Sequence, residues 1–175
     1  DAKANILAKD DYGFTALFFA AQAGHTECAR VLVDAKAELD ARNNDRKTPL
    51  MYSASNGYTT CVRFLVDANA DVHAKDIYGS TALTLTAYHG HSACVKVLIN
   101  AKVDIEAPDN DGKTALMWAA ENGNTACTEL LVSATKTYGD DDMMPQLEEL
   151  TSLTSRASFL NPVQLWQAIK SLLSD

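Results

Sequence analysis

The 175-residue sequence repeats one short phrase four times, at a constant spacing of 33 residues. The phrase is Thr-Ala-Leu or Thr-Pro-Leu, and it starts at Thr15, Thr48, Thr81 and Thr114. A fixed period of this length indicates an array of small stacked units. One unit cannot bury its apolar face alone, so a functional surface is built jointly by neighbouring units. A binding protein is therefore the first hypothesis.

Each unit carries the signals of a short first helix, which we call helix A. The threonine that opens the phrase can accept a hydrogen bond from a free N–H group of the first turn, and Pro49 suits the first helical position. Small and apolar residues follow as far as a glycine, and this spacing predicts about nine helical residues that end in a left-handed glycine. These glycines are Gly24, Gly57, Gly90 and Gly123.

A second helix, helix B, is predicted after each glycine. Its first residues are Thr26, Thr59, Ser92 and Thr125. Apolar residues at helical spacing follow, as in the run 28–33. Between one helix B and the next helix A lies a polar stretch rich in turn formers, such as residues 71–79, which is too short for another helix. We expect this stretch to form a projecting finger.

A helix, a turn, a helix and a finger in 33 residues, with Thr-Pro/Ala-Leu, Ala-Ala, Gly-His and Val-Leu at fixed offsets, resemble the ankyrin repeat. The resemblance covers residues 1 to about 134, with a partial repeat at 1–9. Full repeats start at Asp10, Asn43, Asp76 and Asp109. The resemblance implies an all-α solenoid of helix-turn-helix units with projecting fingers. On this alignment the chain begins partway through a unit, as a fragment of a longer array would.

Some positions depart from the ankyrin pattern. Arg46 stands where the other fingers have Gly13, Gly79 and Gly112. After helix B, Lys36, Asn69 and Lys102 occupy a position that ankyrin repeats often give to glycine. Because lysine adopts a positive φ only at some cost, we expect these turns to be strained or differently wound, and the turn of the second finger to depart from the usual geometry.

The charge balance excludes some classes of partner. The chain carries 15 Lys and Arg against 23 Asp and Glu, a net charge of −8, whereas a nucleic-acid-binding protein normally presents a basic face. No apolar run approaches the roughly 20 residues that span a bilayer. We therefore expect neither nucleic-acid binding nor membrane insertion.

The four cysteines recur at one position of helix B, at Cys28, Cys61, Cys94 and Cys127. Equivalent positions of stacked helices lie roughly 8–10 Å apart, farther than a disulfide or a shared zinc ion allows. We interpret the four as packing residues. Free thiols used in this way suit a reducing compartment, so we expect a cytoplasmic protein, with the nucleus as the alternative.

Other motifs give no support for a cofactor or for catalysis. Residues 109–112 resemble the start of a calcium loop, but Ala107 and Trp118 occupy places that need oxygen ligands. His91 falls where ankyrin repeats carry a structural histidine, which leaves only His89 as a metal-ligand candidate. No nucleophile–base motif, phosphate loop or zinc-hydrolase helix is present. We expect no metal, no cofactor and no enzyme activity.

The ankyrin resemblance places candidate contact residues at the finger tips and on the exposed rim of helix A. We select Tyr12, Phe14, Lys47, Ile77, Tyr78, Tyr88, His89, Lys113 and Glu121 as a protein-binding site. Large aromatic side chains at such places are the type most enriched at interface hot spots. The alternative is that Tyr12, Phe14 and Tyr78 only stabilise adjacent fingers.

Two further columns of equivalent residues recur along the array. The first consists of Lys9, Arg42 and Lys75, which we expect either to be solvated or to face an acidic feature of a partner. The second consists of Phe19, Tyr52, Leu85 and Trp118, at a position of helix A that normally packs between repeats. We assign the second column to the core.

The repeat pattern stops after Ala134, and residues 135–175 form a different segment. Residues 135–142 read as a linker, and helices are predicted from Pro145 and from Asn161-Pro162. The second of these helices has an apolar stripe that includes Trp166. We interpret the helical pair as a cap on the last repeat. A docking helix for another chain, or for an enzyme's regulatory surface, is the alternative.

These patterns predict a non-catalytic protein–protein interaction module or scaffold. It would bind a protein partner, whose identity the sequence does not specify, through fingers and helix A rims, and an isolated fragment would be monomeric. Two alternatives stay open. One is a regulatory or targeting segment of a larger enzyme, such as a kinase or a ubiquitin ligase. The other is a self-assembling structural protein.

Overall fold

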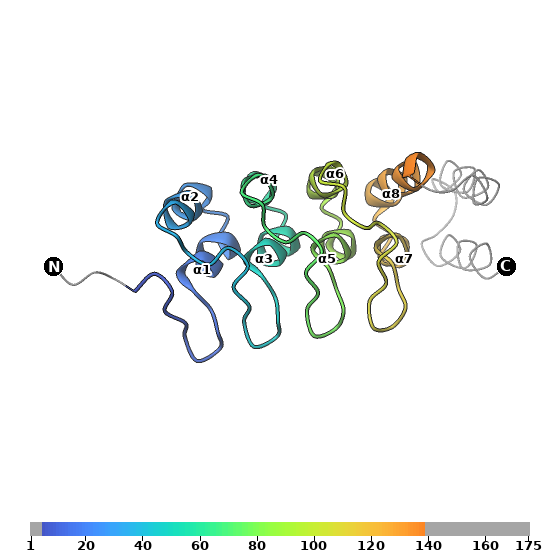
Figure 1. Cartoon of the computed structure of the whole chain (residues 1–175). Helices are drawn as coiled ribbons and strands as arrows, with labels where there is room; N and C mark the ends of the chain where they lie inside the picture. The colour runs from blue at the N-terminus through green and yellow to red at the C-terminus, as the bar shows by residue number, and fades with distance from the viewer. Residues whose placement is uncertain (1–4, 139–175) are drawn as a thin grey trace.

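Eight helices occupy residues 5–138, the part of the chain that the computed structural model describes. They are α1 (Ala16–Gln22), α2 (Thr26–Asp34), α3 (Pro49–Ser55), α4 (Thr59–Asp67), α5 (Ala82–His89), α6 (Ser92–Asn100), α7 (Ala115–Glu121) and α8 (Thr125–Tyr138). In Figure 1, α1, α3, α5 and α7 form an inner row beside four projecting fingers, and α2, α4, α6 and α8 form an outer row. No strand occurs in these residues. The predicted all-α solenoid is confirmed.

The predicted threonine caps form in three of the four inner helices. The side chains of Thr48, Thr81 and Thr114 accept hydrogen bonds from the backbone N–H groups of Met51, Thr84 and Met117 at 3.3, 3.2 and 3.4 Å. Thr15 makes no such bond, and its buried Oγ1 has no partner in residues 5–138. The inner helices have seven or eight residues, which is shorter than predicted, because the chain leaves the helix at or just before the glycine.

The glycines between inner and outer helices are required by backbone conformation and by space. All four have a positive φ, between 70° and 79°. A Cβ atom on Gly57 would lie 2.6 Å from Nδ1 of His91, which belongs to the next repeat. His91 also donates a hydrogen bond from Nε2 to the carbonyl oxygen of Ser55 at 3.0 Å. Each repeat therefore packs directly on the end of the preceding inner helix.

One side chain shapes each finger tip. It is the Asp or Asn that opens the repeat, whose Oδ1 accepts two backbone N–H groups at 2.8–3.1 Å. Backbone hydrogen bonds of 3.0 Å then join successive tips, from Asn44 N–H to Tyr12, from Ile77 N–H to Asp45 and from Asn110 N–H to Tyr78. The fingers therefore form one connected layer rather than four independent loops.

The basic column is part of this scaffold. Lys9 and Arg42 donate hydrogen bonds to the backbone carbonyls of Arg42 and Lys75 at 3.5 and 3.3 Å, and Lys75 donates to that of Pro108 at 2.7 Å. Each basic side chain thus binds the repeat that follows it. Lys9 and Arg42 are also exposed, as a solvated column requires, and the contact with an acidic feature of a partner stays a prediction.

Three of the four cysteines are packing residues, as predicted. Cys61, Cys94 and Cys127 are buried, and Sγ of Cys94 lies 3.3 Å from Oγ1 of Thr59 in the preceding outer helix. Cys28 is exposed, so the prediction is wrong for this residue. The reason is that, among the described residues, α2 contacts an outer helix only on its α4 side.

The departures from glycine do not change the turns. Arg46 has a φ of 60°, which matches the positive φ of the glycines in the other fingers. Lys36, Asn69 and Lys102 have φ values of 71°, 67° and 56°. The expectation that these turns are differently wound is wrong, because the N–H groups of Lys36, Arg46 and Lys102 still donate the hydrogen bonds that close the turns, each at 2.9 Å. The expected strain remains, since this conformation costs a residue with a Cβ atom about 1–2 kcal/mol.

The last helix extends beyond the predicted end of the array. Helix α8 continues to Tyr138, so residues 135–138 are helical and do not belong to a linker. The two helices predicted from Pro145 and Asn161-Pro162, and the stripe with Trp166, lie outside the described residues.

We expect iodoacetamide to modify Cys28 first in the folded protein, because its thiol is exposed whereas Cys61, Cys94 and Cys127 are buried. Burial also raises the pKa of the Cys61 and Cys94 thiols, and that of Cys127 to about 11, and the thiolate is the reactive form. Mass spectrometry after a short exposure measures the extent of labelling at each cysteine. Denatured protein is the control, and native Cys94 that reacts as fast as Cys28 would contradict the expectation.

We expect the change Arg46→Gly to stabilise the fold by about 0.5–1 kcal/mol, because glycine relieves the positive φ but loses more backbone entropy on folding. Urea unfolding followed by circular dichroism measures the free energy. Arg46→Ala removes the same charge and keeps the strain, so it serves as the matched control. Equal stability of the glycine and alanine variants would show that the turn is not strained.

Candidate functional site

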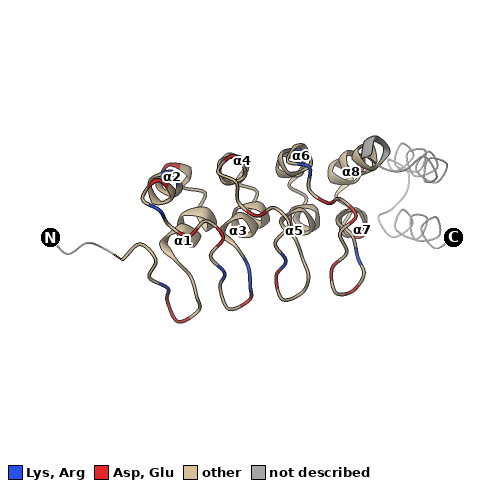
Figure 2. Ribbon diagram, viewed as in Figure 1, with Lys and Arg blue, Asp and Glu red and all other residues tan. Residues whose placement is uncertain are grey.

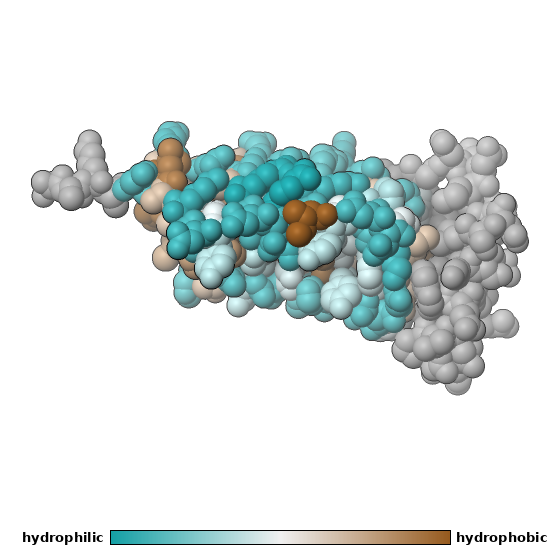
Figure 3. Space-filling view, turned by 90° about the horizontal axis from the view of Figure 1, so that it is seen from below, coloured by the Kyte–Doolittle hydropathy of each residue, from teal (hydrophilic) through white to brown (hydrophobic). Residues whose placement is uncertain are grey.

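The residues selected from the sequence fall on two surfaces. Tyr12, Ile77 and Tyr78 lie at finger tips and are 69%, 41% and 63% exposed. Figure 3 views the array from below and shows a mostly hydrophilic surface, with a hydrophobic spot near its middle and another towards the N-terminal end. Because Tyr12 belongs to the first finger and the other two to the third, they form no continuous patch.

The remaining selected residues line the inner face, which we define as the surface formed by the fingers and the inner helices α1, α3, α5 and α7. They are Phe14, Lys47, Tyr88, His89, Lys113 and Glu121. Three of them come from fingers and three from the ends of α5 and α7. The structure joins the two kinds in the fourth repeat, where Nζ of Lys113 forms an ion pair with Oε2 of Glu121.

The aromatic column that we assigned to the core also borders the inner face. Phe19 is 52% exposed, and Tyr52, Leu85 and Trp118 are only partly buried. The core assignment is therefore wrong for Phe19, whereas Tyr52, Leu85 and Trp118 pack against neighbouring side chains and are partly buried. The reason is that, among the described residues, α1 contacts an inner helix only on its α3 side, so no preceding repeat covers Phe19.

In the fourth repeat, this column joins the finger to the helix through a polar cluster. Nε1 of Trp118 donates a hydrogen bond to Oδ2 of Asp109 at 2.7 Å. Nζ of Lys113 lies 3.9 Å from the centre of a Trp118 ring, a distance suited to a cation–π interaction. Because Asp109 also holds its finger tip through Oδ1, one carboxylate fixes both the finger and the indole.

The second repeat has an equivalent polar cluster, built from different side chains. Nδ2 of Asn43 donates a hydrogen bond to the hydroxyl of Tyr52 at 3.2 Å, and Nζ of Lys47 lies 5.9 Å from the centre of the Tyr52 ring. Burial raises the pKa of Tyr52, the charge of Asp45 adds to the increase, and the bond from Asn43 partly offsets it.

The first repeat replaces the lysine by Phe14 and forms an apolar cluster. The ring of Phe14 lies 5.2 Å from that of Phe18, 5.6 Å from that of Phe19 and 5.4 Å from that of Tyr52. Phe18 is fully buried, and Phe14 covers it. Phe14 therefore has a packing role, in addition to its place on the inner face.

The third repeat lacks both the lysine and the aromatic residue that form the polar clusters of repeats 2 and 4. Ser80 stands in place of the lysine, and Leu85 stands in place of the aromatic residue. Asp76 still holds the finger tip, because its Oδ1 accepts the N–H groups of Tyr78 and Ser80, both at 2.9 Å. Its Oδ2, however, is buried and has no hydrogen-bond partner in residues 5–138. A buried polar atom without a partner is rare in native proteins and calls for an explanation.

Tyr88 and His89 close the end of α5 between the two polar clusters. The ring of Tyr88 lies 5.3 Å from that of Trp118 and 4.9 Å from that of His89, in edge-to-face contacts. Burial lowers the pKa of His89, and the charges of His91 and Lys47 lower it further. The neutral imidazole is thus favoured at this place, and Tyr88 presents an aromatic edge to solvent.

Comparison with known proteins identifies the family. The model of ankyrin repeats (3 copies) matches residues 2–76 and 70–142. The chain belongs to the ankyrin-repeat family. No curated protein matches its sequence. Ankyrin repeats are generally protein–protein interaction modules and are typically not catalytic.

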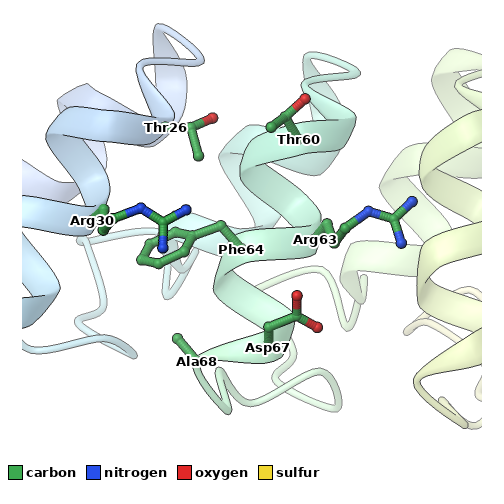
Figure 4. Close-up of a pocket in the computed structure, with 7 residues that line it drawn as sticks. All are labelled: Thr26, Arg30, Thr60, Arg63, Phe64, Asp67 and Ala68. Atoms are coloured by element: carbon green, nitrogen blue, oxygen red, sulfur yellow. The ribbon is translucent and has the colours of Figure 1, made fainter.

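The outer helices of the ankyrin array carry a groove, which Figure 4 shows between α2 and α4. The guanidinium of Arg30 lies 4.8 Å above the ring of Phe64 and 3.6 Å from Glu27. Arg63 points away from that ring, toward the following repeat. Because one arginine already has partners and the other diverges from it, this groove does not gather groups around a ligand.

The first repeat leaves its stacking surface open among the described residues. Ala16, Phe19, Cys28 and Leu32 line a groove of about 500 Å³ there. The equivalent side chains of the later repeats are buried or partly buried. This surface has the composition of a contact between repeats, so we place the candidate site on the inner face instead.

Charge is mixed along the ankyrin fingers. Figure 2 shows basic and acidic residues on the same loops, without a continuous run of basic residues along the ribbon. In residues 5–138, no group of three or more His, Cys, Asp or Glu side chains is arranged to hold a metal ion. None of the helices in that range has the length and apolar character of a bilayer-spanning helix.

Sequence reasoning missed the polar clusters of the inner face. It used Asn43, Asp76 and Asp109 only to mark the start of a repeat, and it placed Tyr52 and Trp118 in the core. A signal was present in the spacing, because lysine recurs four residues after the opening Asn or Asp and an aromatic residue recurs nine residues after it. Only the structure shows that these three side chains meet.

We expect the change Leu85→Trp to stabilise the fold by about 1–2 kcal/mol, because an indole N–H would satisfy Oδ2 of Asp76 as Trp118 satisfies Asp109. Urea unfolding measures the free energy. Leu85→Phe adds a ring without a donor and is the matched control. If both variants have the same stability, Oδ2 of Asp76 does not lack a partner in the folded protein.

Proposed function

We propose that the inner face of this array binds a protein partner. The observation that carries the proposal is the set of partly exposed aromatic side chains Phe19, Tyr52 and Trp118, of which polar groups hold Tyr52 and Trp118 in fixed positions. Tyrosine and tryptophan, which combine an aromatic ring with a hydrogen-bonding group, are enriched among the residues that contribute most to the binding energy of protein interfaces. The lysines above Tyr52 and Trp118, and Glu121, which pairs with Lys113, supply the polar rim of such an interface.

Rigidity supports the same proposal. The finger tips are joined to one another by backbone hydrogen bonds, and the opening Asn or Asp ties each tip to itself. In repeats 2 and 4, that residue also bonds to the inner helix. A surface that is ordered before binding loses little conformational entropy when a partner arrives. The inner face is therefore suited to recognising a folded surface or an extended segment of another protein.

The proposal also covers the cellular compartment and the chemical class of the partner. We propose a non-catalytic scaffold in the cytoplasm or nucleus, because three free cysteines serve as buried packing residues and such thiols persist in reducing compartments. The fingers carry charged residues of both signs. This mixture favours a protein partner over a nucleic acid, which would need a basic surface.

We expect the double change Tyr88→Ala and Lys113→Ala to reduce partner capture from a cell lysate at least about tenfold, since two interface side chains contribute on the order of 1–2 kcal/mol. Quantitative mass spectrometry of the captured proteins measures the loss. The double change Arg63→Ala and Lys96→Ala alters exposed residues of the outer helices and is the matched control.

Both variants must give the circular dichroism spectrum and unfolding midpoint of a folded array. A partner that the outer-helix variant loses and the inner-face variant keeps would contradict the proposal. Recognition would then lie on the outer helices.

A further inference from the structure

The third repeat differs from the second and the fourth in the side chains that surround its opening carboxylate. In repeats 2 and 4, the opening Asn or Asp, a lysine four residues later and an aromatic residue nine residues later form one cluster. The third repeat keeps the carboxylate, as Asp76, but has Ser80 and Leu85 at the other two positions. It therefore lacks the indole donor that Trp118 supplies in the fourth repeat, and it lacks the lysine that both neighbouring repeats hold within the chain.

The direction of the unpaired oxygen follows from the neighbouring repeat. Oδ1 of Asp76 binds the same two finger N–H groups as Oδ1 of Asp109, so the two carboxylates are held alike. Oδ2 of Asp109 meets the indole of Trp118, and Leu85 occupies the place of that indole in the third repeat. Oδ2 of Asp76 thus faces Leu85, which offers no donor. Asp76 is 2% exposed, so the missing donor leaves a buried oxygen without compensation.

The surroundings of this oxygen fit a cation. Leu85 is partly exposed and packs against the edge of the core, so a guanidinium reaches this oxygen when the leucine side chain moves aside. Tyr88 lies one turn further along α5 and is exposed, which places an aromatic ring beside the site. A guanidinium can donate to a carboxylate and stack on an aromatic ring at the same time, and its hydration is weaker than that of an ammonium.

We propose that the third repeat receives an arginine side chain of the protein partner. The guanidinium donates a hydrogen bond to Oδ2 of Asp76 and stacks against Tyr88. The partner thereby supplies in the third repeat the donor and the cation that Trp118 and Lys113 supply in the fourth. This inference rests on the proposed function, because it assigns one contact within the protein-binding inner face.

Two display libraries of random short linear peptides would test the inference. They are identical except that arginine and lysine codons are absent from the second. Both are selected on the whole chain, and each enriched peptide is then measured by fluorescence anisotropy against four variants. Three of these are Leu85→Trp, Asp76→Asn and Leu85→Met, and the fourth is the double variant Tyr88→Ala with Lys113→Ala.

We expect binders only from the library that contains arginine and lysine, with arginine enriched. Their affinity should fall about ten- to a hundredfold in Leu85→Trp, which occupies Oδ2 from within the chain, and in Asp76→Asn, which removes the charge. The asparagine should leave the finger intact, since Asn43 holds the same turn in the second repeat. Leu85→Met adds no donor and should keep the affinity within about twofold.

Other results overturn the inference in distinguishable ways. If peptides from both libraries bind equally well and lose affinity only in the double variant, the inner face binds proteins but Asp76 is not a cation site. If the enriched peptides bind every variant equally, or if the first library yields no binder, both the arginine site and the proposed function fail for this surface.

Discussion

The arrangement of the inner face depends on the hydrogen bonds of one side chain per repeat, the Asp or Asn that opens it. Its Oδ1 accepts two N–H groups and so fixes the finger tip. Its second polar atom points to the inner helix, where it binds Tyr52 in repeat 2 and Trp118 in repeat 4. Finger and helix are therefore one unit, and the side chains between them are presented in fixed positions.

This constraint explains why equivalent positions can carry different functions. The finger of the third repeat has the same backbone hydrogen bonds as the others, because Oδ1 of Asp76 accepts the same two N–H groups. The position nine residues later is then free to vary, and leucine at this place leaves Oδ2 unpaired. Stacking is maintained separately by the glycines, by His91 and by the basic side chains that reach the next repeat. Variation on the inner face can therefore change recognition while the array stays intact.

Much of the fold could be predicted because the signals are local and recur. Three of the four threonine caps, the positive-φ glycines and the helix order follow from residues within one period. The cap at Thr15, the helix lengths and the end of α8 differ from the prediction. Predictions of burial, which depend on the neighbouring repeat, were less accurate. Cys28 and Phe19 have the residue types of packed positions, yet both are exposed, because burial depends on what stacks against them. For the candidate site, the sequence predicted a surface of fingers and helix A rims, which stays a prediction, but not the contacts that organise it.

The sequence by itself determined the period, the helix boundaries to within a few residues and the family, since caps, glycines and spacing act over one or two turns of chain. The tertiary structure alone decided which side chains meet. Lys75 and its acceptor at Pro108 are 33 residues apart, and Asp109 and Trp118 come together only because a finger folds back on its helix. The same folding leaves Oδ2 of Asp76 without a donor among the described residues. Hydrogen bonding and burial depend on distances in space, and a one-dimensional pattern gives those distances only within an element.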